Sequence, residues 1–505
     1  MSPHPYDADS IEEITITELQ AAMQHGHLTA QYLVELYLER IQKLNPLLNA
    51  VIEINPDALN IARQLDQERA QTGPRGLLHG IPVLLKENIA TADNMQTTAG
   101  SLALLGSRPP RDAYIVSRLR AAGAIILGKA NLSEWANFRS TSSSSGWSAR
   151  GGQCHNPYVL DRTPCGSSSG SAVAVAANLS VVAVGTETDG SILCPAHANG
   201  VVGIKPTVGL TSRSGVIPIA HSQDTIGPFG RTVADAALLL GAMTGVDARD
   251  PATLASKGQF YTDYSRFLDA QGLRGARIGI PRQTYFGYSR HMDTCANAAI
   301  ELLRAQGATI IDPADIPTAQ QASKSEDEMT VLLHEFKADL NAYLAALEQT
   351  EMRTLADLIA FNEAHAGQEM PYFGQELFLQ AEETTSLNDP AYLTARKECL
   401  RLARTEGIDA VMDQYQLDAL VMPTGSPAWC IDLINGDTGT GGCSQLAALA
   451  GYPAISVPMG YIHEVPLGLT FVGRAFSEPT LIRLAYAFEQ ASHARRKPRY
   501  LPTVP

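Results

Sequence analysis

A serine- and glycine-rich run at residues 165–191 constrains this chain more than any other stretch. It begins Cys-Gly-Ser-Ser-Ser-Gly-Ser (165–171) and ends Gly-Thr-Glu-Thr-Asp-Gly-Ser (185–191), with small apolar residues between. Serine hydroxyls can satisfy the free N–H groups at a helix start, so we predict a tightly packed helix from about Ser168. A buried strand is predicted over 181–186, because this segment is short, apolar and β-branched.

The end of the run predicts a site for a negatively charged oxygen. Residues 188–191 are expected to form a tight turn, and such a turn can aim several backbone N–H groups at one point. A phosphate-binding loop is a second interpretation of the glycines, but the Gly-Lys-Ser/Thr ending is missing and the next lysine is Lys205. Plain helix capping, without a catalytic role, stays open at this point.

Several motifs along the chain resemble, in order and spacing, those of the amidase signature family. The family's Gly-Gly-Ser-Ser-Gly-Gly-Ser run corresponds to the segment around Ser167, and its Gly-Thr-Asp-x-Gly-Gly-Ser-Ile turn to the segment ending at Ser191. The family's lysine corresponds to Lys86, within Gly-Ile-Pro-Val-Leu-Leu-Lys-Glu-Asn (80–88). Further similar segments are 127–135, 156–157, 200–207 and 224–228.

The resemblance implies an α/β fold and a Ser-Ser-Lys triad. The fold would be a mixed, largely parallel central sheet covered by helices on both faces. Ser191 is expected to attack an amide carbonyl, Ser167 to relay the proton from a position held by a cis peptide bond, and Lys86 to act as the base. Amides are poor electrophiles with poor leaving groups, so an oxyanion hole is also needed. It is expected from the backbone N–H groups of Thr188, Asp189, Gly190 and Ser191.

A lysine can serve as a base near neutral pH only if its pKa is lowered, since an exposed lysine is protonated there. The apolar residues 83–85 before Lys86 favour desolvation of its side chain. A short strand over 81–85 places the lysine at a strand end. A helix over 112–122 and a strand over 124–128 continue the alternation of helices and strands that is typical of α/β folds.

A Ser-His-Asp hydrolase is the main catalytic alternative. Gly-Ser-Ser-Ser-Gly (166–170) matches the nucleophile elbow Gly-x-Ser-x-Gly, with Ser168 at its centre. An elbow requires a buried strand directly before it. The preceding residues, 161–165, are polar and contain a proline, which disfavours that reading.

The substrate class follows from a narrower resemblance. Segments 133–139, 145–152 and 164–170 are most similar to the bacterial peptide amidases of the family, which remove ammonia from C-terminal carboxamides of peptides. A peptide or small-molecule amide is therefore the predicted substrate, and no cofactor is implied. The candidate substrate contacts are Asn137, Ser140 and Ser168.

Two departures from the family pattern leave other substrates open. Leu193 stands where the family often has an arginine, which weakens recognition of glutamine, and Cys165 and Ser169 replace glycines of the serine loop. A small aliphatic or aryl-acetamide amidase of the same family remains an alternative. A transamidase subunit of the glutamine-dependent amidotransferase A type is another.

Composition excludes several partners. The 505 residues are 45% hydrophobic and 18% charged, and a net charge of −14 disfavours nucleic acid or an anionic membrane as partner. No apolar run reaches the length of a transmembrane helix. The polar N-terminus carries no signal-peptide pattern, so the default expectation is the cytoplasm, with export open if a signal was removed. A monomer is favoured.

The seven cysteines show no repeated spacing, so no disulfide framework is predicted and they are expected to be free, buried side chains. The cysteines and histidines at Cys154, His155, Cys194 and His197 leave zinc as an alternative. No Cys-x-x-Cys pair accompanies them, and no metal site is predicted.

The chain is expected to form one domain with a helical insert at 324–416 that caps the site. A helix over 29–44 is predicted to stop at Pro46. Residues 132–138 are predicted to be helical, and the polar loop 139–153 that follows is expected to line the site.

Overall fold

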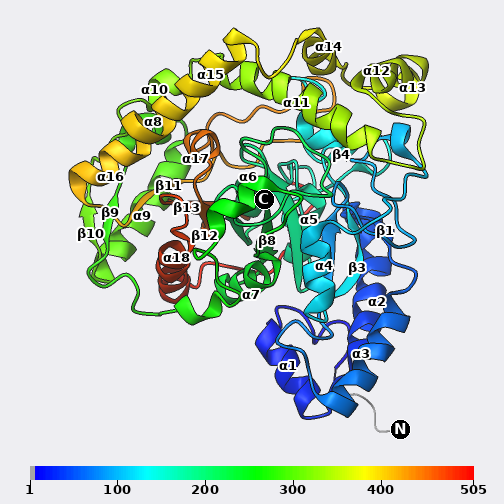
Figure 1. The fold of residues 1–505 in the computed structure, drawn as a ribbon. Coiled ribbons are helices and arrows are strands. Elements are labelled where there is room, and N and C mark those ends of the chain that lie inside the picture. Colours follow the sequence, from blue (N-terminus) through cyan, green and yellow to red (C-terminus); the bar gives the residue numbers. More distant parts are fainter. Residues whose placement is uncertain (1–5) are drawn as a thin grey trace.

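The computed structural model describes residues 6–505 and centres on one large mixed β-sheet (Figure 1). Within these residues the sheet has eleven strands, in the order β1-β3-β2-β6-β8-β7-β12-β13-β11-β9-β10, and β4 and β5 form a separate hairpin. Most of the polar N-terminal segment lies outside the described residues. The strands are β1 (Val51–Ile54), β2 (Pro82–Lys86), β3 (Ile125–Ala130), β4 (Trp147–Ser148), β5 (Gly152–Gln153), β6 (Val182–Glu187), β7 (Val202–Lys205), β8 (Thr225–Gly230), β9 (Arg277–Gly279), β10 (Thr309–Ile311), β11 (Ala419–Pro423), β12 (Ala454–Ile462) and β13 (Val465–Val472).

The sheet is mixed, as predicted, and its parallel character is concentrated in two blocks. Strands β3, β2 and β6 run parallel near one end, and β11, β9 and β10 run parallel at the other. The strands between these blocks and the edge strand β1 pair antiparallel. The alternation of helices and strands does not reveal this antiparallel centre, because β12 and β13 form a hairpin and β7 and β8 pair across a long loop.

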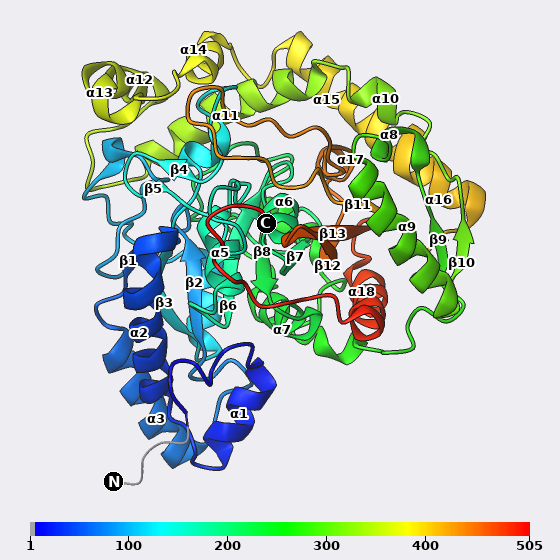
Figure 2. The same ribbon diagram turned by 180° about the vertical axis from the view of Figure 1, so that it is seen from behind.

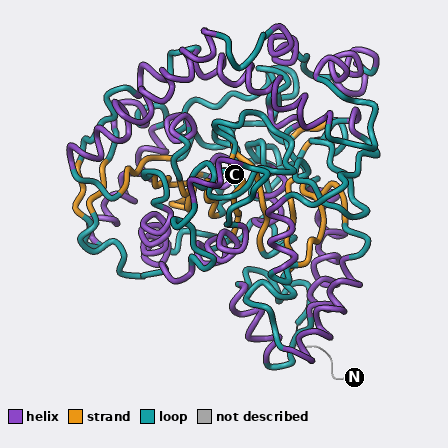
Figure 3. The backbone as a smooth tube through the Cα atoms, viewed as in Figure 1, coloured by secondary structure: helices purple, strands orange, loops and turns teal. Residues whose placement is uncertain are grey.

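Helices surround the sheet, with the strands inside (Figure 3). Alternate residues of a strand point to opposite faces. A Cβ added at Gly227 of β8 would meet Ile192, which precedes α6, whereas one added at Gly230 would meet Ala236 of α7. Helices therefore cover both faces. They are α1 (Ile16–Gln24), α2 (Ala30–Leu48), α3 (Ala58–Thr72), α4 (Tyr114–Ala121), α5 (Ser169–Ala176), α6 (Leu193–Ala198), α7 (Val233–Met243), α8 (Arg282–Tyr285), α9 (Arg290–Ala305), α10 (Ala319–Ala322), α11 (Asp327–Ala345), α12 (Leu355–Ala364), α13 (Ala366–Glu369), α14 (Glu376–Glu383), α15 (Pro390–Leu400), α16 (Asp409–Tyr415), α17 (Gln445–Ala450) and α18 (Glu478–Ser492).

Helix α5 confirms the helix predicted at the serine run. All of its side chains are buried, and they are small, so the helix packs closely against β2, β3, β6 and β8. A Cβ at Gly170 would lie 2.3 Å from the Ala50 carbonyl oxygen, so only glycine fits there. The close packing fixes the loop before α5 relative to the sheet.

Two local predictions are wrong. Helix α2 continues through Pro46 to Leu48, because a proline removes only one intrahelical donor so near the C-terminus, and left-handed Asn49 then caps the helix. The helix predicted over 132–138 is a short 3₁₀ turn, Glu134–Asn137. Trp135 and Ala136 have positive φ angles within it, so the chain does not continue as a helix.

Helices α10–α16 form an arch along one side of the molecule, seen from the front and from behind (Figures 1 and 2). Helices α11, α12 and α14 share a hydrophobic cluster with Trp135, Phe138, Ile217 and Ile219. The Phe138 and Phe336 rings meet edge to face, 5.0 Å apart. The arch is thus packed onto loops of the sheet region. Within residues 6–505, no helix has the length and apolar character needed to cross a membrane.

Candidate active site

Lys86, the last residue of β2, is fully buried next to the serine run. Its Nζ lies 2.8 Å from the Ser167 Oγ, 2.8 Å from the Thr186 Oγ1 and 3.3 Å from the Thr186 carbonyl oxygen. Burial lowers the pKa of Lys86 to about 7, although the carboxylates of Asp224 and Glu187 oppose the shift. A substantial fraction of this lysine is therefore uncharged near neutral pH.

The serine loop positions Ser167 and Ser168 differently. The Gly166–Ser167 peptide bond is cis, and the Ser167 hydroxyl points to Lys86. The Ser168 Oγ donates to the Thr186 carbonyl at 2.9 Å and accepts the Thr186 N–H at 3.2 Å. Both hydrogen bonds of the Ser168 hydroxyl are thus made with β6. Residues 163–168 form a loop, whereas a nucleophile elbow requires a strand there. This setting disfavours the elbow alternative and gives no support to a substrate contact of the Ser168 hydroxyl, which stays a prediction.

The turn at 188–191 presents unpaired N–H groups beside these serines. Those of Asp189, Gly190 and Ser191 have no hydrogen-bond acceptor in the described part of the chain. Gly190 has a φ of 79°, which glycine adopts at little cost. The Ser191 carbonyl accepts the Ser168 N–H at 3.2 Å, so the two serine segments touch. The Ser191 hydroxyl has no partner among residues 6–505 and is 8% exposed.

Glu187 holds the backbone that follows this turn. Its Oε2 accepts the N–H groups of Ile192 at 2.7 Å and Leu193 at 2.9 Å. Burial raises its pKa, with Lys205 acting in the opposite direction. Its bonds to the turn make Glu187 a structural anchor.

Asp224 holds the first residue of the turn, Thr188. Its Oδ1 accepts the Thr188 hydroxyl at 2.6 Å, while its Oδ2 accepts the N–H groups of Ile219 and Ala220. Burial raises the pKa of Asp224 to about 6. The sequence placed Asp224 only within a family-like motif, and no local signal revealed its contact with Thr188.

Asn137 and Ser140, both predicted to bind substrate, lie in different settings. The Asn137 Oδ1 is buried without a partner in the described residues, and a Cβ added at Gly166 would lie 3.3 Å from it. Asn137 therefore borders the serine loop and stays a candidate. The Ser140 Oγ instead donates to the Glu376 Oε1 at 2.7 Å, which ties its loop to α14 and does not support a substrate contact.

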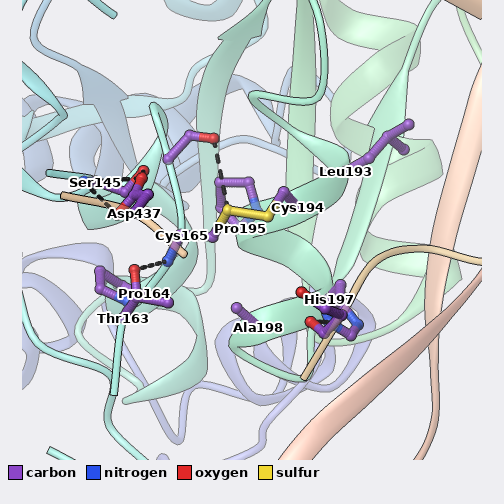
Figure 4. The surroundings of a disulfide bond; sticks show 12 residues. Ser145, Thr163, Pro164, Cys165, Leu193, Cys194, Pro195, His197, Ala198 and Asp437 are labelled. Atoms are coloured by element: carbon purple, nitrogen blue, oxygen red, sulfur yellow. Dashed lines mark hydrogen bonds between the residues drawn. A yellow bond between two sulfur atoms is a disulfide. The ribbon is translucent and has the colours of Figure 1, made fainter. Parts of the chain in front are cut away.

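Two of the cysteines form a disulfide, contrary to the prediction that all are free. Cys165 and Cys194 are bridged, with their Cα atoms 5.8 Å apart (Figure 4). Their sequence separation of 29 residues gave no recognisable framework spacing, and only the fold brings them together. The bridge joins the serine loop to α6.

His197, which the sequence left open as a zinc ligand, and the buried His79 have hydrogen-bond partners within the protein. His197 Nδ1 accepts the Gly468 N–H at 2.7 Å and its Nε2 donates to the Ser426 carbonyl at 2.9 Å, while burial lowers its pKa to about 4. His79 Nε2 bonds the Leu65 carbonyl. The disulfide takes Cys194 away from the zinc alternative, since a bridged cysteine is not a thiolate ligand. Elsewhere, ligand atoms of His221, Glu335 and Asp339 lie within 4.8 Å of one another, but hydrogen bonds inside the protein already use them.

A cavity of about 380 Å³ adjoins the site. Thr186, which binds Lys86, and Thr188, the first residue of the turn, form part of its wall. Apolar residues 216–219 form another part, and Asp339 and Tyr343 of α11 complete it from the arch. The cavity therefore lies between the arch and the residues Thr186 and Thr188, which border the catalytic lysine and the turn.

The fold thus brings together a buried lysine with a lowered pKa, a serine bonded to it, a second serine whose hydroxyl is unbonded, and a turn with free N–H groups. The family model described as Amidase matches residues 32–482. A protein of Arabidopsis thaliana named "Probable amidase" is 49% identical over 97% of this chain and 92% of its own length. The chain belongs to the amidase signature family, and it is an amidase.

Two solved structures show which members of the family this chain is similar to. The peptide amidase PAM in complex with the competitive inhibitor chymostatin matches with a TM-score of 0.94 and 54% identity, over 97% of this chain and 99% of that chain. The native peptide amidase from Stenotrophomonas maltophilia matches with a TM-score of 0.93 and 53% identity, over 99% of this chain and all of that chain. This chain is thus similar over nearly its whole length to peptide amidases.

Proposed function

We propose that the protein hydrolyses the C-terminal carboxamides of peptides to carboxylates and ammonia, through an acyl-enzyme on Ser191. The single observation that supports this most is the chain from buried Lys86 to Ser167, next to the unbonded Ser191 hydroxyl and the free N–H groups of the turn. A nucleophile, a base and an oxyanion site then lie together, as covalent hydrolysis of an amide requires.

In the proposed acylation step, uncharged Lys86 accepts the proton of Ser167, and Ser167 takes the proton of Ser191. The Ser191 Oγ attacks the carbonyl carbon, and the N–H groups of Asp189, Gly190 and Ser191 stabilise the oxyanion. The proton returns through Ser167 to the leaving nitrogen, which departs as ammonia. Water then attacks the ester by the same proton route and releases the peptide acid.

The proposal requires that Lys86 exchange protons near neutral pH. Its pKa of about 7 supports this, because a general base works best when its pKa lies near the working pH. Charged Lys86 can donate to Ser167 and Thr186, whereas uncharged Lys86 can accept from Ser167 while still donating to Thr186. Both states of the lysine thus keep hydrogen-bond partners.

A peptide substrate is favoured over a very small amide. The cavity of about 380 Å³ beside the turn has room for an amino-acid side chain, and residues 216–219 give it an apolar wall. The whole-length likeness to peptide amidases supports the same substrate class. At the position of the family arginine, Leu193 is 1% exposed and packs in a hydrophobic cluster, which gives no support to glutamine recognition.

We also propose that the chain acts as one unit in which region 324–416 caps the substrate cavity. Asp339 of α11 binds His221, and Glu335 accepts the Ser222 N–H at 2.9 Å. These loop residues lie just before Asp224, the anchor of Thr188. The arch therefore has a direct path of contacts to the catalytic turn.

Ammonia release from a matched panel of amides tests the function. We expect the highest kcat/KM with dipeptide amides and lower values with acetamide, an aryl-acetamide and glutamine. Dipeptides with a free C-terminal carboxylate serve as the control and should release none. Preference for the small amides would contradict the peptide assignment, and release of ammonia from none of them would contradict the proposed function.

A further inference from the structure

The Cys165–Cys194 disulfide joins the two segments that carry the serines of the site. Cys165 lies two residues before Ser167, and Cys194 lies three residues after Ser191. Figure 4 shows the bridge between the loop of Thr163–Cys165 and the start of α6. No other disulfide is present in residues 6–505, and the remaining cysteines there are free.

Each bridged segment is otherwise held mainly by its own neighbourhood. On the serine loop, the Cys165 N–H donates to the Thr163 Oγ1 at 3.0 Å, and its carbonyl accepts the Ser169 hydroxyl at 2.6 Å. On the turn, the Cys194 N–H donates to the Gly190 carbonyl at 2.8 Å. These bonds shape the loop and the turn separately and do not hold one against the other.

Few bonds cross between the two segments. The Ser168 N–H reaches the Ser191 carbonyl at 3.2 Å, and the Asn199 side chain, just beyond α6, reaches the Pro164 carbonyl at 2.8 Å. The disulfide is the covalent link placed between these contacts. Both segments also contact β6, the serine loop through the Ser168 hydroxyl on Thr186 and the turn through Glu187, and the disulfide adds a direct link between them.

We propose that the Cys165–Cys194 disulfide positions the two catalytic serines and makes amide hydrolysis depend on the oxidation state of this bridge. The inference rests on the proposed function. A reducing dithiol opens the bridge by thiolate attack on one sulfur, and its second thiol resolves the mixed disulfide, leaving two cysteine thiols and a cyclic disulfide of the reagent. Reacting groups displaced by about 1 Å can lose roughly 10²-fold in rate.

The first part of the experiment maps the bridge without using activity. Unreduced protein is denatured, alkylated and analysed by peptide mass spectrometry. We expect Cys165 and Cys194 to be protected and linked, and Cys430, which is exposed, to be alkylated. Full alkylation of both Cys165 and Cys194 would overturn the proposal, whatever the enzyme hydrolyses.

The second part compares rates. The double variant Cys165→Ser/Cys194→Ser should lose about 10- to 100-fold in kcat with little change in KM, and its kcat/KM–pH profile should shift because Ser167 no longer meets Lys86 and Ser191 in one geometry. Dithiothreitol should lower the wild-type rate toward that of the double variant, and reoxidation should restore it. Cys430→Ser, the matched control, should behave as wild type.

A third variant separates positioning from folding. Cys165 has a φ of 55°, which glycine adopts readily, so Cys165→Gly removes the bridge without backbone strain. We expect cooperative unfolding to be retained and kcat to fall as in the double variant. A kcat within twofold of wild type in both bridge-free proteins would overturn the proposal. If no amide is hydrolysed, we compare the same proteins by the rate at which a serine-directed acylating reagent modifies Ser191, instead of by kcat.

Discussion

The serine centre and the arch-facing wall of the cavity are held together in different ways. In the serine centre, buried Lys86 bonds the hydroxyls of Ser167 and Thr186, and the Ser168 hydroxyl bonds the backbone of Thr186 in β6. On the wall, carboxylates of α11 hold the loop at 221–224 through His221, Ser222 and Gln223. The titrating group of the centre is Lys86, and that of the wall is His221.

Because of this difference, we expect the serine centre to determine the rate of the chemical step and the wall to determine substrate binding. Changes in the centre should alter kcat by orders of magnitude, because reacting atoms must meet in one geometry. Changes in the wall should alter KM by small factors and in a pH-dependent way. Glu328 joins the two regions: it accepts hydrogen bonds from Gln223 and Gln445, and burial together with neighbouring Asp189 raises its pKa.

The largest expected effect is that of Ser191→Ala. Loss of a covalent nucleophile typically costs about 10⁴-fold or more in kcat, and the small hydroxyl leaves little cavity behind. Ammonia release and circular dichroism should show an inactive, folded protein. Ser167→Ala should retain more activity, because a water molecule can take the place of the relay hydroxyl. Greater damage in Ser167→Ala than in Ser191→Ala would reverse the assigned roles.

The Lys86→Ala variant should lose about 10²- to 10⁴-fold in kcat/KM, as expected for removal of a general base. In the wild type, kcat/KM should rise with pH through about 7, the pKa of Lys86, because only the uncharged lysine accepts a proton. The variant should lack this limb, and Lys86→Arg should not restore it. Lys129→Met is the matched control, since Lys129 is also buried but bonds Ile89 and Thr97, away from the serines. Persistence of the limb without Lys86 would assign the base elsewhere.

An intermediate effect is expected for Glu187→Ala. It leaves the N–H groups of Ile192 and Leu193 without their acceptor and frees the turn, so we expect kcat to fall on the order of 10²-fold while KM changes little. Glu187→Gln keeps a carbonyl oxygen in the same place and should recover most of the rate. Equal losses in both variants would show that the charge, and not the anchoring, matters.

The smallest effect is expected at the arch, for Asp339→Asn. The hydrogen bond from His221 to Asp339 raises the pKa of His221, against the effect of burial. The charged pair is therefore complete below the ordinary histidine pKa and is lost as pH rises through the raised value. KM should increase about two- to fivefold at low pH, with the difference shrinking at higher pH. Exposed Glu348→Gln serves as the control, and a pH-independent change would contradict this role for the pair.

The sequence predicted well what depends on local pattern. The small, buried residues of the serine run formed α5, the apolar segments formed β2 and β6, and the glycine at 190 formed the turn. The family motifs correctly indicated that Lys86 and Ser167 come together. These features follow from local residue propensities or from motifs whose order and spacing resemble those of the family.

Distant contacts that no family motif marks were not predicted. Thr188 and its anchor Asp224 are 36 positions apart, and the cysteine bridge spans 29. No periodicity links such pairs, because only the sheet order places β8 beside β6. For the same reason the sequence did not reveal the hydrogen bonds of the Ser140 and Ser168 hydroxyls, since their partners Glu376 and Thr186 come from other elements.

Trapping the acyl-enzyme tests the central claim most directly. The enzyme is treated with a serine-directed acylating reagent or a slowly deacylated substrate, digested and mapped by tandem mass spectrometry. The acyl group should be found on Ser191 alone, in proportion to lost activity, and modification should slow as pH falls below about 7 with protonation of Lys86. An acyl group on Ser167, Ser168 or a cysteine, with matching inactivation, would contradict the assignment of Ser191 as the nucleophile.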